Sequence, residues 1–172
     1  ESNTKLLEKR CFFDILGANA YGLRHGPDDR RLALDRDVNF SRPLLIRDLM
    51  VRNGDAAKPM WAAEVGWNAL PADFPDVSLF GRVDRVMQAE YTARAYRRAA
   101  TEWPWMGIMT LWHFRLVTPR ATHLQQYYFN VVDDDFGPTP LYAAMHALTR
   151  EPSVVRAGTR QESNPAIVYD AG

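Results

Sequence analysis

The sequence predicts an α/β fold, namely the C-terminal part of a (β/α)8 TIM barrel with about three β/α units. Apolar segments alternate three times with helical patterns, which is typical of parallel strands joined by helices that cover the sheet. Long segments follow the strands, and polar or aromatic residues gather at the strand ends, as on the active face of a barrel. No glycine-rich phosphate loop follows any strand, which disfavours a Rossmann sheet. A complete barrel needs about 250 residues, whereas this chain has 172.

The first unit begins with an apolar run over residues 12–20, closed by Tyr21 and Gly22. This pattern predicts a buried strand that ends in a turn. Residues 22–39 carry many charges and turn-forming residues, so we expect a long loop there. Long loops inside compact domains are usually functional or mobile.

A helix over residues 40–52 completes the first unit. Ser41 suits the N-cap position, and Pro43 suits the first turn, where its missing N–H costs nothing. Asn53 and Gly54 then supply the stop.

The second unit repeats the order of strand, loop and helix. An apolar run predicts a strand over residues 60–65, and a segment rich in proline, aromatic and acidic residues predicts a long loop over 68–80. Apolar residues recur at helical spacing from 83 to 101, which predicts an amphipathic helix there.

The third unit comprises an apolar strand over residues 105–114, a long loop over 115–135 and a helix over 140–149. We therefore expect residues 1–150 to form one portion of a barrel domain. Residues 151–172 have little helical signal, and we interpret them as a linker or the start of a further module.

Composition excludes several classes of function. Lys and Arg together number 21 and equal Asp and Glu together, so no charge excess favours nucleic acid or an anionic membrane surface. No apolar run approaches the roughly 18 residues of a membrane span. The single cysteine, Cys11, excludes an internal disulfide framework and a multi-cysteine zinc site. The chain begins at Glu1 without an initiator Met, so we expect processing or truncation that leaves room for an upstream signal.

We expect neither a metal nor a cofactor. Acidic residues 133–135 suit a cation site or, more often, a solvated turn. No serine lies in the Gly-x-Ser-x-Gly context of a nucleophile elbow. Metal-ligand spacing is also absent among the four histidines, which are His25, His113, His123 and His146.

Glu64 is the leading candidate for a catalytic residue. It lies inside the apolar segment 61–67, where an ionised carboxylate is costly to bury without partners. Such a residue is either part of a functional site or a strand-end Glu paired with a nearby Arg. Tyr21 ends the preceding strand and could donate its hydroxyl to Glu64, or it could simply cap the core with its hydroxyl in water.

Four further residues are candidates for substrate binding. Trp67 and Trp112 are flat rings that suit a sugar platform, although core packing is the commoner role of a Trp. Asn19 lies at the end of the first strand beside Tyr21, and His25 lies in the first long loop, from which it could reach a ligand.

Three segments together resemble clan A glycoside hydrolases, the cellulase-like superfamily. Residues 58–67 (KPMWAAEVGW) resemble its seventh barrel strand, where the Glu of a K-P-apolar-E-x-G-W pattern is the nucleophile. Trp112 resembles the tryptophan at the end of strand eight, which floors the sugar subsite. Residues 14–22 resemble strand six, where many family 5 members carry His-x-Tyr and the Tyr hydrogen-bonds the nucleophile. This chain has Asn19 and Tyr21 at those positions, which argues against a standard family 5 endoglucanase.

Residues 136–148 also resemble the closing helix eight of the clan, so the resemblance spans about residues 11–150 and places the chain at strands six to eight. It implies a retaining enzyme that cleaves O-glycosidic bonds in β-linked sugars or polysaccharides, with Glu64 as nucleophile. The clan's acid/base Glu follows an Asn at the end of strand four, and no Asn-Glu pair occurs in this chain. The resemblance therefore implies a partner, the missing N-terminal half of the barrel, and an inactive fragment without it. It also implies an extracellular or cell-surface protein.

Two other interpretations stay open. One is a carbohydrate-binding pseudoenzyme barrel that kept the aromatic floor and lost the chemistry. The other is an unrelated open α/β domain in which Glu64 is the partner in a structural ion pair.

Overall fold

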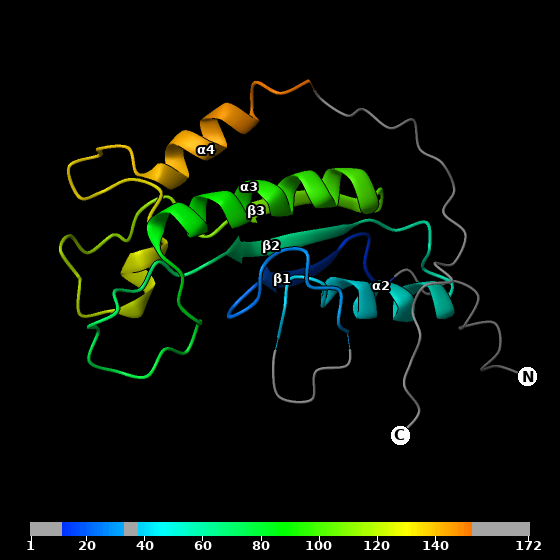
Figure 1. Ribbon diagram of the computed structural model, residues 1–172. Coiled ribbons are helices and arrows are strands. Elements are labelled where there is room, and N and C mark those ends of the chain that lie inside the picture. The colour runs from blue at the N-terminus through cyan, green and yellow to red at the C-terminus, as the bar shows by residue number, and fades with distance from the viewer. Residues whose placement is uncertain (1–11, 33–37, 153–172) are drawn as a thin grey trace, which may run out of the picture.

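The structure is a computed structural model that describes residues 12–32 and 38–152 (Figure 1). Its strands pair in the order β1-β2-β3, and both pairings are parallel, which confirms the predicted α/β class. In chain order the elements are β1 (Leu16–Tyr21), α2 (Pro43–Arg52), β2 (Met60–Gly66), α3 (Arg85–Glu102), β3 (Met106–Leu111), the 3-10 helix η1 (Gln125–Phe129) and α4 (Pro140–Leu148).

The prediction of where the strands and loops lie was wrong at three places. Phe12, expected in a buried strand, is 76% exposed, and β1 begins only at Leu16. β3 ends at Leu111, three residues before the predicted end. The loop predicted over 115–135 contains η1. Apolar composition alone does not distinguish a paired strand from the exposed segment that leads into it.

Ser41 does not cap α2, although its type and position suggested that role. The N-cap is Arg42, which makes no side-chain capping bond. The Ser41 hydroxyl instead donates to the backbone oxygen of Asp29 and accepts a bond of 2.8 Å from Nη1 of Arg98. Ser41 therefore ties the β1–α2 loop to α3, because a buried hydroxyl takes the partners that the packed loop offers.

The main core lies between the sheet and the helices. Ala20 of β1 and Met60, Ala62 and Val65 of β2 are fully buried and belong to one apolar cluster with residues of α2 and α3. A second, smaller cluster joins α3 and α4, which lie side by side (Figure 1). Burial of apolar surface in these clusters is the main term that holds the helices on the sheet.

The opposite face of the sheet is open. Trp61 and Ile108 are register partners on β2 and β3, and they are 41% and 46% exposed. Gly17 and Asn19 of β1 are exposed on their own strand as well. In a barrel this face would line the interior, where strands from the rest of the ring cover it.

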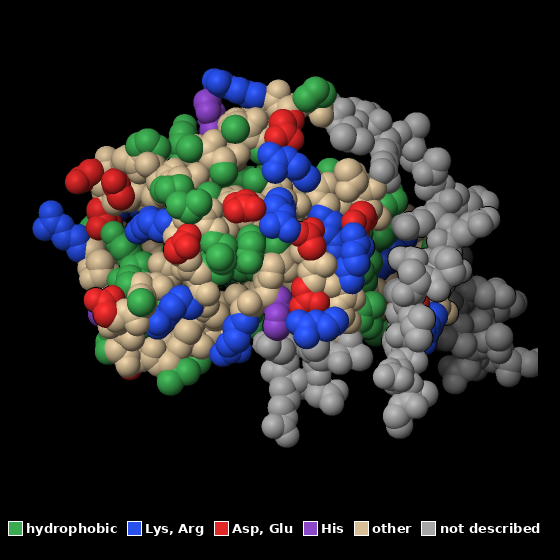
Figure 2. All heavy atoms as spheres, in the orientation of Figure 1, with side chains coloured by type: hydrophobic (Ala, Val, Ile, Leu, Met, Phe, Trp, Pro, Cys, Tyr) green, Lys and Arg blue, Asp and Glu red, His purple; other side chains and the backbone are tan. Residues whose placement is uncertain are grey.

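The surface over α3 and α4 mixes the two signs of charge. Figure 2 shows basic and acidic side chains interspersed on this side of the molecule. Arg97 of α3, for example, pairs with Glu151 at 2.5 Å.

Within the described residues, no helix is long and apolar enough to cross a bilayer. Cys11 and the predicted linker from residue 153 onward lie outside the described residues.

Candidate active site at the carboxyl ends of the strands

Glu64 receives two hydrogen bonds from the neighbouring strand. The Tyr21 hydroxyl donates to Oε2 of Glu64 at 2.5 Å, and Nδ2 of Asn19 donates to the same oxygen at 3.1 Å. The bond predicted between Tyr21 and Glu64 is confirmed. All three side chains lie near the carboxyl ends of β1 and β2, the edge at which α/β proteins bind ligands.

An extra residue in β2 brings Glu64 to this position. Ala18 pairs with Ala62, but the next residue of β1, Asn19, pairs with Glu64, so Ala63 has no partner. Without that bulge, Glu64 would share the face of Ala62, which is buried against the helices. A bulge shifts the alternation by one residue and re-aims the side chains that follow. Glu64 therefore faces the open side with Asn19 and Tyr21, and Val65 takes the buried side.

The environment of Tyr21 keeps its phenol protonated. Burial raises the pKa of Tyr21 far above its usual 10.0, and the hydrogen bond to Glu64 and the charge of that carboxylate raise it further. The phenol is thus a permanent donor, and an O–H bond to a carboxylate is among the stronger hydrogen bonds in proteins.

Two phenylalanines, neither of which stands out in the sequence, support the Tyr21 ring. Phe80 lies 6.3 Å from Tyr21 and Phe129 lies 5.8 Å from it, measured between ring centroids. Phe129 is buried beneath Gly66, where an added Cβ would come within 3.1 Å of the Phe129 ring and 3.0 Å of the Trp112 oxygen. Phe80 lies on the β2–α3 loop and Phe129 lies on η1, so only the tertiary structure brings the two rings together.

Trp112 directly follows β3 at the same edge of the sheet. Its backbone N–H donates to the oxygen of Val65 at 2.9 Å, which places it next to the strand that carries Glu64. The indole is half-buried, its ring centroid lies 5.1 Å from that of His113, and the peptide bond between the two residues is cis. A substrate contact by Trp112 stays a prediction that this placement permits.

Trp67 is a core residue, so the prediction that it forms a sugar platform was wrong. Its side chain is 1% exposed, and its ring packs against Phe40 and Tyr91. An added Cβ on Gly22 would lie 2.0 Å from the indole, so the chain passes directly over the ring. The indole nitrogen donates to the His25 oxygen at 2.8 Å, which satisfies the buried polar atom.

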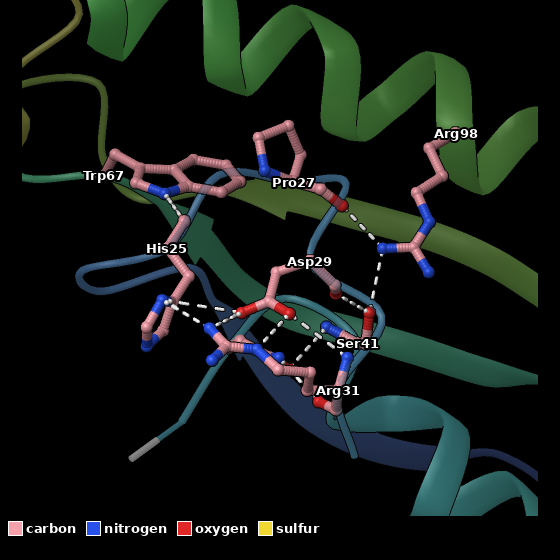
Figure 3. A network of polar contacts seen from close by, with 8 residues as sticks. His25, Pro27, Asp29, Arg31, Ser41, Trp67 and Arg98 are labelled. Carbon is pink, nitrogen blue, oxygen red and sulfur yellow. Dashed lines mark hydrogen bonds and ion pairs between the residues drawn. The ribbon is translucent and has the colours of Figure 1, made fainter. Parts of the chain in front are cut away.

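The His25 ring belongs to a second polar network, shown in Figure 3. Its Nδ1 lies 3.4 Å from the Asp29 carboxylate and 3.2 Å from the Arg31 guanidinium. Hydrogen bonds from Arg31 hold the pKa of Asp29 well below its usual range. Arg98, almost fully buried on α3, donates to the Pro27 oxygen in the same loop at 2.5 Å. The network holds the β1–α2 loop in place, and contact of His25 with a substrate stays a prediction.

The acidic run 133–135 forms a turn. Oδ1 of Asp133 accepts the backbone N–H groups of Asp135 at 3.0 Å and Gly137 at 2.6 Å. Among the described residues, no group of three His, Cys, Asp or Glu side chains is arranged to hold a metal ion.

Comparison with solved structures identifies the fold. No family model and no curated protein matches the sequence. A family 39 glycoside hydrolase from the gut symbiont Bacteroides cellulosilyticus WH2 superposes on 88% of this chain with a TM-score of 0.62 and 18% identity. The chain has the fold of part of a glycoside hydrolase. It spans about 30% of the length of that enzyme.

Two β-glucuronidases are more distant structural neighbours. The Faecalibacterium prausnitzii enzyme has 16% identity and a TM-score of 0.49 over 83% of this chain and 22% of its own. The Bifidobacterium dentium enzyme has 18% identity and the same TM-score over 82% and 22%. The glycoside hydrolase fold therefore rests on the family 39 structure, and the role of each residue is argued from this chain's own geometry.

Proposed function

We propose that this chain is the C-terminal part of a retaining glycoside hydrolase barrel and supplies its nucleophile, Glu64. In this proposal β1, β2 and β3 are strands six, seven and eight. The observation that carries it is the pair of hydrogen bonds from Tyr21 and Asn19 to a single oxygen of Glu64, at the carboxyl edge of the sheet. The two donors, Tyr21 and Asn19, carry no charge, so Glu64 is not the partner in a structural ion pair with them. A carboxylate held by neutral donors at a strand end suits a catalytic role.

The two oxygens of Glu64 would then have different tasks. Both hydrogen bonds go to Oε2, so Oε1 is the oxygen that would attack the anomeric carbon of a β-linked sugar. The bond from Oε1 to that carbon forms as the glycosidic bond breaks, and the leaving oxygen takes a proton from a general acid. Water, deprotonated by the same group acting as base, then releases the sugar and regenerates the carboxylate. Tyr21 and Asn19 hold Glu64 in place throughout.

The general acid would come from another part of the barrel. A retaining enzyme needs its two carboxyl groups about 5 to 5.5 Å apart. The clan's acid/base motif, Asn-Glu, does not occur in this sequence. Glu90 and Glu102 both lie on α3, and Glu102 is engaged by Arg30 and Arg98. The chain alone would accordingly be inactive, and the open sheet face would be covered by the rest of the barrel.

The experiment that tests this proposal is trapping of the nucleophile. The protein that carries the complete barrel is incubated with 2-deoxy-2-fluoro β-glycosides that bear a good leaving group, and its peptides are then analysed by mass spectrometry. We expect the peptide 58–67 to carry the fluoro-sugar on Glu64. Glu64→Gln should abolish turnover of 4-nitrophenyl β-glycosides, whereas Glu90→Gln, an exposed change on α3, should leave it unchanged.

Two outcomes would contradict the proposal. Turnover by Glu64→Gln at the wild-type rate would exclude Glu64 as nucleophile. Sugar binding by the wild-type protein without any turnover or labelling would favour the carbohydrate-binding pseudoenzyme instead.

A further inference from the structure

We propose that Phe80 is a positioning residue for the hydrogen bond between Tyr21 and Glu64, and that Gln125 fixes Phe80 by clamping its loop. This inference rests on the proposed function, because the bond concerned is made to the proposed nucleophile. Phe80 lies on the β2–α3 loop and Gln125 on η1, so neither belongs to a strand end.

Phe80 completes a cluster of three aromatic rings. Its ring centroid lies 5.5 Å from that of Phe129, with the planes at 86°, and 6.3 Å from that of Tyr21. Tyr21 and Phe129 are also in edge contact, at 5.8 Å and 66°. Edge-to-face contacts of this kind favour particular ring orientations. The Tyr21 ring thus packs against two rings that also contact each other, one of them buried (Phe129) and the other on a loop (Phe80).

Gln125 fixes the loop that carries Phe80. Its side chain is 9% exposed and bridges two backbone groups, because Oε1 accepts the Leu79 N–H at 2.9 Å and Nε2 donates to the Val77 oxygen at 2.8 Å. The Gln125 backbone oxygen in turn accepts a bond of 3.1 Å from the fully buried Asn68. The amide therefore uses both of its polar ends to hold the residues that precede Phe80.

A second contact fixes the loop immediately after Phe80. Gly81 has a φ of +74°, and a Cβ at this position would lie 2.3 Å from the Leu23 oxygen. The loop thus touches the chain two residues beyond Tyr21. Arg24 adds a longer bond of 3.4 Å to the Ser78 oxygen. Phe80 therefore lies between two fixed points of its loop. One is the pair of bonds from Gln125, and the other is the contact of Gly81 with Leu23, which follows Tyr21 in the chain.

Loss of this support would act on catalysis through Tyr21. A short O–H bond to a carboxylate is sensitive to angle and distance, so a displacement of the Tyr21 ring that moves its hydroxyl away from Glu64 weakens the bond steeply. Small displacements of groups that hold a reacting atom can lower a rate by a large factor. The support is therefore expected to influence kcat rather than KM.

The test is a double-mutant cycle in the protein that carries the complete barrel. Phe80→Ala should lower kcat on 4-nitrophenyl β-glycosides about tenfold, with little change in KM. In the Tyr21→Phe background the same change should have less than about a twofold effect, because the bond that Phe80 serves is already gone. Equal effects in the two backgrounds would overturn the proposal, since Phe80 would then act independently of Tyr21.

A graded series tests the clamp. Gln125→Glu keeps the acceptor for Leu79 and loses the donor to Val77, whereas Gln125→Leu loses both. We expect kcat to be lower in Gln125→Glu than in the wild type, and lower still in Gln125→Leu. Val77→Ala is the matched control, because its side chain is 83% exposed and Gln125 binds only its backbone. An unchanged kcat in Gln125→Leu would overturn this part of the proposal.

Titration of the Tyr21 phenol provides a readout without turnover. In the folded Phe80→Ala and Gln125→Leu proteins the ionisation of Tyr21, followed by ultraviolet difference spectra against Tyr21→Phe, should begin at a lower pH than in the wild type, because burial and the bond to Glu64 raise its pKa. The same onset of ionisation in the wild type and both variants would contradict the positioning role. Failure of the proposed function would instead appear in the Glu64→Gln assay and leave this titration unaffected.

Discussion

The Tyr21 hydroxyl lies 2.5 Å from Oε2 of Glu64, across two strands whose register contains one unpaired residue. The extra residue, Ala63, turns Glu64 toward the open face of the sheet, and the phenol then meets a carboxylate that would otherwise face the helices. Strand alternation, the bulge and the aromatic support of Tyr21 together determine this geometry.

Removal of the phenolic hydroxyl should impair catalysis and preserve the fold. Tyr21→Phe loses a hydrogen bond to a charged group, which is worth about 1.5 to 3 kcal/mol. We expect kcat to fall by about tenfold to a hundredfold, as measured on 4-nitrophenyl β-glycosides with the complete barrel. Tyr142→Phe is the matched control on the exposed side of α4 and should leave kcat unchanged. Equal rates in Tyr21→Phe and the wild type would contradict a role for this bond.

Insertion of one alanine between Ala18 and Asn19 should abolish activity. The inserted residue would pair with Ala63, and the restored regular alternation would return Glu64 to the face of Ala62, against the helices. The insertion variant should match Glu64→Gln in turnover, whereas Ala63→Ser, which keeps the bulge, should keep most of the activity. A folded insertion variant with wild-type turnover would show that the bulge does not orient Glu64.

Two glycine substitutions should differ sharply in their effect on stability. Gly22→Ala would place a methyl group 2.0 Å from the buried Trp67 ring, whereas Gly17→Ala meets nothing within 4 Å. Overpacking of this kind costs about 1 to 3 kcal/mol or more, so Gly22→Ala should lower the midpoint of urea denaturation. Gly17→Ala should leave it unchanged or raise it slightly. Equal midpoints for the two variants would argue against the close approach of Gly22 to Trp67.

Acid should weaken the network around His25 by protonating Asp29. Hydrogen bonds from Arg31 lower the pKa of Asp29 below its ordinary 3.8. The stabilisation is therefore present above about pH 3.8 and is lost as the pH falls through the lower pKa of the folded state. Because Arg31 is exposed, we expect a contribution of about 1 kcal/mol at most.

The measurement for this prediction is thermal denaturation between pH 2 and 7. Asp29→Asn should be less stable than the wild type at pH 7, and the difference should narrow as the pH falls from about 3.8 toward 2. Asp76→Asn, a change at an exposed loop carboxylate, should run parallel to the wild type. A constant difference between Asp29→Asn and the wild type at all pH values would mean that Asp29 acts through packing rather than charge.

The order of strands and helices, the α/β class and the leading candidate residues of the site could be predicted from the sequence. Apolar runs, helical periodicity and capping residues are local signals, and they locate elements within a few residues. Glu64 and Tyr21 were found because a carboxylate in an apolar run and a Tyr at the neighbouring strand end are visible in the chain itself. Parallel pairing then brings consecutive strand ends together.

Which aromatic residues lie beside Tyr21 could not be predicted from the sequence. Trp67 proved to be core, and Phe80 and Phe129 took the places beside Tyr21. The bulge at Ala63 and the clamp of Gln125 on the β2–α3 loop were likewise invisible in the sequence. The physical reason is that a single unpaired residue sets which face each later side chain takes, and contacts between loops distant in sequence depend on how the whole core packs.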